Sequence, residues 1–457
     1  MNLWWHPLLL ENKKIFRFYS KERSKRILKV AMPSASNSLL DIINMVIDLL
    51  MIGSFGASAV VAVSVSLNYI MMFFSVSSIL FVGNSTLIAR FLGAKEKKQA
   101  NEVVYNLLLA SIFISIPFVI FGFLGMDYYF DWMNISQDAK ELGLMYLGIV
   151  IFNFPFILIR QVCISSFSAS GLTTLPFYVK IFITFLNISL KYCLIFGFLF
   201  IPALGVKGAA ISTLIVTIAE AAILFSCLFL YPRSPIRISG NFNFDYIKRA
   251  LKIGFPTGFE RLSTLFVILL MTKFIAMYGT IALAGYQIAT KIEAFAFMPG
   301  FGFTVAAMAL VGQNIGAKKP LEAKYSALNT ILIGGTFMGI AGLIMSIFAP
   351  FFSDFFTNDS QVIQASIAYL IPIGLSQIPL AVIFILDGAL RGAGVTKITL
   401  VVNVIMIWGI RVIPCAIIAH FGIPVIWIYI CITLETFLRA YVYWIIFAKG
   451  KWRNHKV

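Results

Sequence analysis

Charged residues, histidine and cysteine are scarce in this sequence. Charged residues make up 12% of the 457 amino acids, whereas hydrophobic residues make up 60%. A soluble chain of this length has too little interior to bury so much apolar surface. The composition therefore excludes a soluble globular fold and favours an all-α polytopic membrane protein.

The scarcity of histidine and cysteine excludes several kinds of site. The five cysteines all fall inside apolar segments without a Cys-x-x-Cys pair, and the three histidines are scattered. We therefore expect buried thiols and no metal site beyond a possible Na⁺. The sequence also lacks a Gly-x-x-x-x-Gly-Lys phosphate loop and any Ser/His arrangement, so we expect no ATP site, no cofactor and no enzymatic activity.

The net charge of +17 does not indicate a nucleic-acid-binding surface. The basic residues lie in short links between apolar runs, where they act as topology signals. We therefore expect the lipid bilayer, and no nucleic acid, as a partner.

Twelve apolar runs are long enough to span a bilayer, and they fall into two sets of six. The first set lies at about residues 30–53, 59–82, 103–123, 142–165, 175–200 and 208–231. The second set lies at about residues 253–277, 282–310, 326–352, 362–390, 398–420 and 423–448.

Basic residues cluster in the amino-terminal segment, the even-numbered links and the tail, and the odd-numbered links are nearly bare of them. Two odd links carry acids instead, among them Asp131 and Asp354. The positive-inside rule therefore predicts that both termini face the cytoplasm of a multi-pass protein in the inner (plasma) membrane. An even number of spans is consistent with that orientation.

The two sets of spans form an internal repeat with an offset of 223 residues. This offset places Pro33 on Pro256, and the Gly93-Ala94-Lys95 turn on Gly316-Ala317-Lys318. Because six spans separate equivalent points, the halves have the same orientation, which predicts two six-helix lobes related by a pseudo-twofold axis along the membrane normal. Two such bundles facing one another are typical of carriers with alternating access.

The expected domains follow from the spans. Residues 26–231 form the amino-terminal lobe and residues 249–448 form the carboxy-terminal lobe. Residues 1–25 form a cytoplasmic or interfacial segment, residues 232–248 a cytoplasmic linker, and residues 449–457 a cytoplasmic tail. We expect a monomer.

Several motifs, in order and at repeat-consistent positions, resemble the multidrug and toxic compound extrusion (MATE) family. They are Asp48 followed by Gly53 and Gly56, the segment Gly312-Gln-Asn-Ile-Gly-Ala-Lys318, the segment Leu204-Gly-Val-Lys-Gly-Ala-Ala-Ile-Ser-Thr213, and Leu390-Arg-Gly-Ala-Gly394. The resemblance covers about residues 26–449. It implies export of lipophilic, mainly cationic compounds in exchange for Na⁺ or H⁺.

Carboxylates inside the spans are the candidate coupling residues, because an ionisable group at mid-membrane costs at least about 2.5–3.5 kcal/mol. Asp41 and Asp48 lie on one face of the first span together with Asn37 and Asn44. The resemblance links Asp48 to cation coupling in the amino-terminal lobe. The alternative is that these groups only fix helix packing.

Glu260, one turn after Pro256, is the leading candidate for a Na⁺ or H⁺ site, because the proline frees a carbonyl oxygen near it. Glu293 is the next candidate, with pairing to Lys291 or Lys273 as the alternative. Asp387 is a further candidate.

For Asp387 the simpler interpretation is an i,i+4 ion pair with Arg391. Two further intramembrane ion pairs are expected from equal depth along neighbouring helices, Lys191 with Glu220 and Arg411 with Glu435.

Soft and aromatic side chains are expected to line a substrate cavity, because they adapt to many apolar shapes. The candidates, with polar groups of the same spans, are Asn37, Asn44, Met71, Phe74, Gln287, Phe297 and Met298. The sequence leaves open a second function, that of a flippase for lipid-linked oligosaccharides, which would need a cationic cavity. Lys191 and Arg411 are the residues that keep this alternative open. The sequence does not distinguish Na⁺ from H⁺ as the coupling ion.

Overall fold

The computed structural model describes residues 19–198, 202–232 and 234–455, so most of the expected interfacial segment lies outside the described residues. Every element in the described ranges is a helix. The chain divides into two compact units. The amino-terminal unit runs from Ser36 to Leu265, and the carboxy-terminal unit contains the described residues up to Ala35 and those from Phe266 onward.

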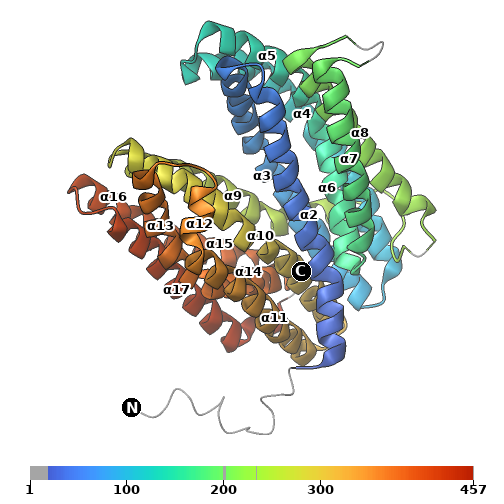
Figure 1. Cartoon of the computed structure of the whole chain (residues 1–457). Coiled ribbons are helices and arrows are strands. Elements are labelled where there is room, and N and C mark those ends of the chain that lie inside the picture. The colour runs from blue at the N-terminus through green and yellow to red at the C-terminus, as the bar shows by residue number, and fades with distance from the viewer. Residues whose placement is uncertain (1–18, 199–201, 233, 456–457) are drawn as a thin grey trace, which may run out of the picture. The chain divides into compact units, whose positions relative to one another are not determined.

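The amino-terminal unit contains the consecutive helices between Ala57 and Leu230, together with parts of the helices Lys21–Gly53 and Phe244–Ala276 (Figure 1). Its complete helices are α3 (Ala57–Gly93), α4 (Lys97–Met133), α5 (Gln137–Val150), η2 (Ile151–Asn153), α6 (Phe154–Ser170), α7 (Thr174–Phe196) and α8 (Gly205–Leu230). The carboxy-terminal unit contains α10 (Thr280–Gly316), α11 (Pro320–Ile347), α12 (Ala349–Asp354), α13 (Ser360–Leu375), α14 (Gln377–Gly392), α15 (Thr396–Met406), η3 (Ile407–Val412), α16 (Ile413–His420), α17 (Ile426–Lys449) and η4 (Lys451–Asn454).

Helices α2 (Lys21–Gly53) and α9 (Phe244–Ala276) are each divided between the two units. The division of α2 falls at Ala35, just after Pro33, and that of α9 falls at Leu265, beyond Pro256. The carboxy-terminal unit therefore contains two separate stretches of the chain, and α2 and α9 are each shared between the two units.

Ten helical segments of the described chain are long and apolar enough to cross a membrane. The pair α13 and α14, bent by 55° at a short break, provides an eleventh span. Helix α9 is not among these segments, and it carries Glu260 and Arg261 near its middle, so the described residues give up to eleven of the expected twelve spans. The prediction of an all-α protein with two sets of long apolar helices is confirmed.

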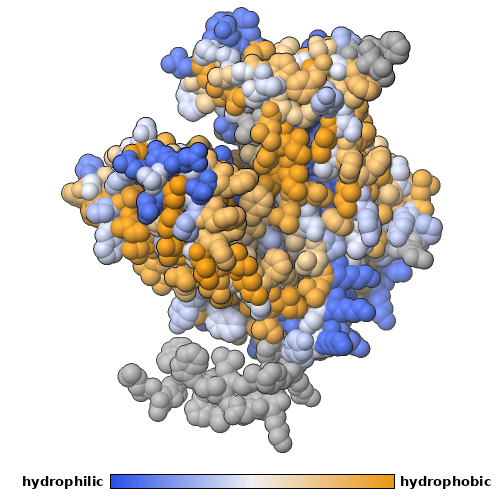
Figure 2. All heavy atoms as spheres, in the orientation of Figure 1, coloured by the Kyte–Doolittle hydropathy of each residue, from blue (hydrophilic) through white to orange (hydrophobic). Residues whose placement is uncertain are grey.

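Large apolar side chains remain exposed along the helices. Phe121, Phe185 and Phe351 are each exposed by 70% or more. On the face drawn in Figure 2, apolar residues cover the long sides of helices and hydrophilic residues gather toward helix ends. A surface of this kind is stable against lipid rather than water.

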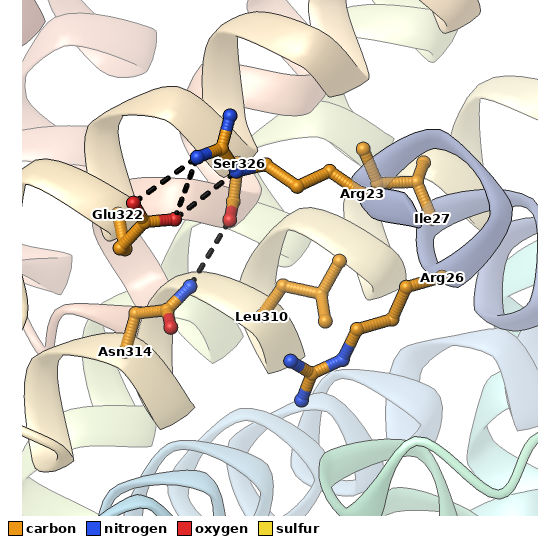
Figure 3. Close-up of a pocket in the computed structure, with 7 residues that line it drawn as sticks. All are labelled: Arg23, Arg26, Ile27, Leu310, Asn314, Glu322 and Ser326. Atoms are coloured by element: carbon orange, nitrogen blue, oxygen red, sulfur yellow. Dashed lines mark hydrogen bonds and ion pairs between the residues drawn. The ribbon is translucent and has the colours of Figure 1, made fainter. Parts of the chain in front are cut away.

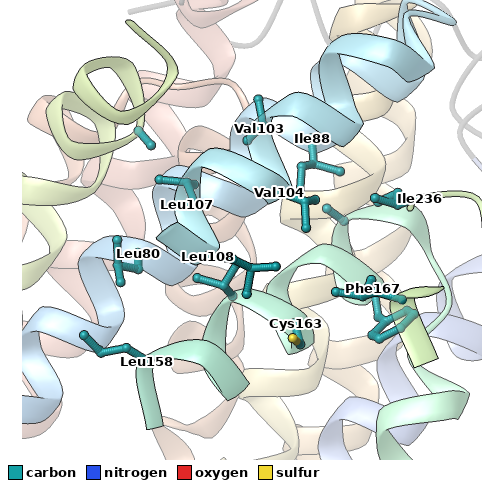
Figure 4. Close-up of a cluster of buried hydrophobic side chains, with 14 of the residues drawn as sticks. Leu80, Ile88, Val103, Val104, Leu107, Leu108, Leu158, Cys163, Phe167 and Ile236 are labelled. Carbon is teal, nitrogen blue, oxygen red and sulfur yellow. The ribbon is translucent and has the colours of Figure 1, made fainter. Parts of the chain in front are cut away.

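The core of the amino-terminal unit lies between α3, α4 and α6 (Figure 4). Leu107 of α4 and Leu158 and Cys163 of α6 are fully buried there. Asn84 of α3 is buried in the same core, and its amide donates to the Val162 carbonyl at 3.0 Å and to the Ser165 and Ser166 hydroxyls. All five cysteines are free; Cys163 and Cys415 are buried as expected, whereas Cys193, Cys227 and Cys431 are only partly buried.

The repeat predicted from the sequence is present in the packing. A Cβ added to Gly254 of α9 would lie 2.0 Å from the Ile79 carbonyl oxygen of α3. A Cβ added to Gly302 of α10 would lie 2.4 Å from the Ala31 carbonyl oxygen of α2. The offset of 223 residues relates Gly254 to Ala31 and Gly302 to Ile79. The two contacts thus join repeat-equivalent pairs of positions, and in each of them a glycine of the second half lets a first helix of one half pack closely on a second helix of the other.

The Gly-Ala-Lys turns of the two halves share one backbone conformation. Lys95 and Lys318 both have positive φ angles, 65° and 57°, although neither is glycine. Equal strain at equivalent positions indicates that the two turns are one repeated structure.

The first turns of α2 are fixed to the carboxy-terminal unit by polar contacts around a small pocket (Figure 3). Arg23 donates two hydrogen bonds to Glu322 of α11, at 3.0 and 3.1 Å. Arg26 donates to Gln313 of α10 at 2.5 Å, and Asn314 donates to Ser326 at 3.0 Å. These contacts hold the start of α2 on α10 and α11.

Candidate functional site

Two polar stripes face each other in the amino-terminal unit. Helix α2 carries Asn37, Asp41, Asn44 and Asp48, and α7 carries Lys180, Thr184, Asn187 and Lys191. Both stripes advance by four, three and four residues, so each forms one line along its helix. The Lys180 Nζ lies 2.6 Å from the Asp41 Oδ1, and Lys191 forms an ion pair with Asp48.

Asn44 lies between the acids of these two ion pairs along α2, and it also contacts α7. Its amide donates to the Thr184 hydroxyl at 3.1 Å, and its oxygen accepts from the Asn187 amide at 3.3 Å. The α2 stripe therefore faces the α7 stripe, although the Asp41 side chain is 66% exposed.

The predicted ion pair between Lys191 and Glu220 is wrong. Lys191 continues the α7 stripe toward α2, so its ammonium reaches Asp48 instead. Glu220 of α8 pairs with Arg160 of α6, with 2.7 Å between Nη1 and Oε2. Equal depth in the membrane could not fix the partner, because the rotation of each helix about its axis decides which neighbour a side chain meets.

Each of the three carboxylates of this network has its own basic partner. Asp41 pairs with Lys180, Asp48 with Lys191, and Glu220 with Arg160. Lys180 and Arg160 were missing from the candidates. Lys180 could have been found from its place in the α7 stripe, whereas no spacing signal marked Arg160.

Glu293 of α10 is the centre of a different arrangement in the carboxy-terminal unit. Its carboxylate accepts a hydrogen bond of 2.7 Å from the Tyr369 hydroxyl of α13. Among the described residues no lysine or arginine forms an ion pair with it, so the alternative pairing with Lys291 or Lys273 is wrong. Gln377 of α14 lies beside Glu293. The positive charge of Arg411 also interacts with the Glu293 carboxylate.

Aromatic rings pack around the tyrosine that contacts Glu293. The Tyr369 ring lies edge-on between Tyr286 and Tyr429, with centroid distances of 5.3 and 5.1 Å. The Gln377 Oε1 and the Tyr429 hydroxyl are buried and have no hydrogen-bond partner among the described residues. A carboxylate beside a residue with an uncommitted amide oxygen, here Gln377, suits a proton or a hard cation such as Na⁺.

The predicted pair between Arg411 and Glu435 is confirmed. The Arg411 Nη2 lies 2.5 Å from the Glu435 Oε2, and Arg439 adds a second contact at 3.0 Å. Glu435 is fully buried. Arg411 belongs to η3, a π-helical turn within its span, and such turns often occur at functional sites.

Asp387 has two structural partners. Arg391 lies 2.7 Å from it in the expected i,i+4 pair, and the Tyr443 hydroxyl donates to it at 3.1 Å. The simpler interpretation of Asp387 is therefore confirmed.

Glu260 lies partly exposed on α9, one turn after Pro256, and the Thr264 hydroxyl donates to its backbone carbonyl at 2.9 Å. Its role in coupling stays a prediction.

The expected cavity residues have different surroundings within their own units. Met71 and Gln287 are exposed, and Phe74 packs against a core that includes Tyr69. Phe297 lies 6.1 Å from the Phe301 ring, and Met298 is half-buried. The substrate roles of all seven expected residues stay predictions. No cluster of His, Cys, Asp or Glu in the described chain could hold a metal ion.

The MatE family model matches residues 33–193 and matches again at residues 256–417. The chain belongs to the MatE family. The two matches begin 223 residues apart, which is the offset of the internal repeat, so the family unit is present twice.

Curated relatives of this MatE protein match nearly its whole length. The "Probable multidrug resistance protein NorM" of Thermotoga maritima is 26% identical, covering 95% of this chain and 94% of its own. The "Uncharacterized transporter YisQ" of Bacillus subtilis is 28% identical, covering 83% of this chain and 85% of its own.

Solved structures share the fold. One described as the outward-facing conformation of a multidrug resistance MATE family transporter has a TM-score of 0.88 at 19% identity, covering 95% of this chain and 97% of its own. A MOP superfamily transporter from Pyrococcus furiosus, described as having a binding pocket of reverse polarity, has a TM-score of 0.87 at 20% identity, with the same coverage. The chain is thus a two-lobed, polytopic membrane protein of the MatE family.

Proposed function

We propose that this protein is an antiporter that exports lipophilic, mainly cationic compounds across the plasma membrane by alternating access. Export is driven by inward movement of Na⁺ or H⁺. MatE family membership and the multidrug resistance relatives support the class of substrate. The twofold repeat supports alternating access between two similar bundles.

The proposal that a cation drives export rests on the partners of the Glu293 carboxylate. Asp41, Asp48, Glu220, Asp387 and Glu435 each have a basic partner within ion-pair distance. Glu293 has a tyrosine hydroxyl and an amide instead. A membrane carboxylate without a fixed counter-ion gains most from binding a cation.

Cation binding at Glu293 would change the charge balance of its surroundings. Glu435 faces Arg411 and Arg439, so these three groups together carry one excess positive charge. An ionised Glu293 offsets that charge, and a neutralised Glu293 does not. Loading and release of the cation therefore alter the forces among α10, α13 and the span containing η3, which is the change a coupled carrier needs.

The flippase alternative requires unpaired basic side chains inside the membrane that could bind the pyrophosphate group of a lipid-linked oligosaccharide. Lys191 pairs with Asp48, and Arg411 pairs with Glu435. Each of these two cations already has a carboxylate partner, which favours the antiporter.

The experiment is efflux of ethidium from proteoliposomes under an imposed Na⁺ gradient and, separately, an H⁺ gradient. We expect one of the gradients to drive efflux in the wild type and in Glu141→Gln, a control at an exposed position of α5. Glu293→Gln is expected to abolish gradient-driven efflux. If Glu293→Gln matches the wild type, coupling does not involve Glu293, and if neither gradient moves the dye, antiport of lipophilic cations is ruled out.

A further inference from the structure

The ion pair between Lys191 and Asp48 has a more specific consequence than helix packing. Lys191 is only 3% exposed, whereas the Asp48 side chain is 31% exposed. The lysine thus approaches Asp48 from the buried side, between α2 and α7. A cation that entered to bind Asp48 would meet a carboxylate already neutralised by an ammonium group.

The surroundings of Asp48 have the chemistry of a cation site. Tyr146 of α5 lies close enough to interact with Asp48, and Thr213 of α8 lies beside Tyr146. Asn187, one turn before Lys191, has a buried side-chain oxygen without a hydrogen-bond partner among the described residues. Carboxylate, amide and hydroxyl oxygens are the ligands that hard cations prefer.

We propose that the Lys191 ammonium is a built-in cation that permanently occupies the Asp48 site, so that Asp48 and the oxygens around it bind no coupling ion. Removal of the lysine charge would convert the same oxygens into a working Na⁺ or H⁺ site. The titratable groups near Asp48 are Lys191 and the neutral Tyr146, and the next layer along the stripe holds the Asp41–Lys180 pair.

The alternative is that Lys191 only fixes the packing of α7 on α2. Two features argue against it. The Asn44 hydrogen bonds already join α2 to α7 at the same level of the bundle. In addition, a charged side chain inside a membrane costs free energy, whereas small and neutral polar groups can pack helices without that cost.

This inference rests on the proposed function, since it concerns the ion that the antiporter uses, but its test does not depend on transport. Thermal unfolding of the purified protein in lipid nanodiscs is measured against NaCl, with choline chloride keeping the ionic strength constant, and separately against pH. All variants carry Glu293→Gln, so differences among them report the amino-terminal unit.

Lys191→Met is expected to gain a saturable stabilisation by Na⁺ or by acid, of about 2 °C or more at tenfold the dissociation constant. Lys191→Arg, which keeps the charge, and the double variant Lys191→Met with Asp48→Asn are expected to gain none. A Lys191→Met response equal to that of Lys191→Arg would overturn the proposal. It would also be overturned if Asp48→Asn alone removed a Na⁺ response from the background protein.

Misfolding of Lys191→Met would also be informative. Lys191→Gln then takes its place with the same expected response. If both single variants fail to fold while the double variant with Asp48→Asn folds, Asp48 requires a fixed cation, as proposed. If the double variant fails as well, Lys191 acts in packing and the proposal is wrong.

Discussion

The Glu293 carboxylate of α10 accepts a 2.7 Å hydrogen bond from the Tyr369 hydroxyl of α13. This bond connects Glu293, which forms no ion pair among the described residues, to a helix that is bent against its neighbour by 55°. In the proposed antiporter, occupancy of Glu293 by a cation would thus be transmitted to a broken span.

Tyr369→Phe is expected to weaken the apparent affinity for the coupling ion. The variant removes a hydrogen bond to a charged group, worth about 1.5–3 kcal/mol, which corresponds to about a 10- to 100-fold change. The measurement is the ion concentration that gives half-maximal efflux. Tyr278→Phe is the control, because its hydroxyl donates to the backbone carbonyls of Ile418 and Ile423 instead. Equal shifts in the two variants would contradict a role of Tyr369 at the ion site.

Arg160→Met and Glu220→Met are each expected to destabilise the protein by about 3–5 kcal/mol, because each leaves its partner buried and unpaired. The double variant should be much closer to the wild type in stability, since neither charge then remains. Thermal unfolding followed by size-exclusion chromatography measures the three variants. Additive effects of the two substitutions would show that the pair is not coupled.

Gly254→Ala is expected to lower stability by at least about 1–3 kcal/mol, because the added methyl group meets the Ile79 backbone. Gly335→Ala in α11 is the matched control, since a Cβ there would have nothing within 4 Å. Thermal midpoints of both variants provide the comparison. A tolerated Gly254→Ala would contradict close packing of α9 on α3.

Asp387→Asn is expected to reduce stability without changing the ion dependence of efflux. The variant weakens the ion pair with Arg391 and the hydrogen bond from Tyr443, at a cost of about 1–3 kcal/mol. Stability and ion-dependent efflux are measured on the same preparation. If the efflux of this variant no longer depends on the ion while its stability is unchanged, Asp387 would have a role in coupling.

Local patterns along the chain predicted the long apolar helices and the repeat. The 223-residue offset predicted from Pro33 and Pro256 reappears in the family matches and in the φ angles of Lys95 and Lys318. The α2 stripe was also predictable, because its polar residues share one helical face.

An ion pair was predictable from the sequence only where two residues of opposite charge lie at similar depth in the membrane and also on helices that turn them toward each other. Arg411 and Glu435 satisfied both conditions. Lys191 and Glu220 have similar depth, but they point toward different helices, α2 and α6. Helix rotation and the identity of the neighbours are set by tertiary packing, which one sequence does not specify.

The most direct test of the central claim is the cation movement that accompanies substrate. A Na⁺- or pH-sensitive dye sealed inside proteoliposomes reports whether addition of ethidium releases the coupling ion. The wild type is expected to release Na⁺ or H⁺ in proportion to ethidium uptake, and Glu293→Gln is expected to release neither. Substrate-evoked release of the same size from Glu293→Gln would contradict the assignment of coupling to Glu293.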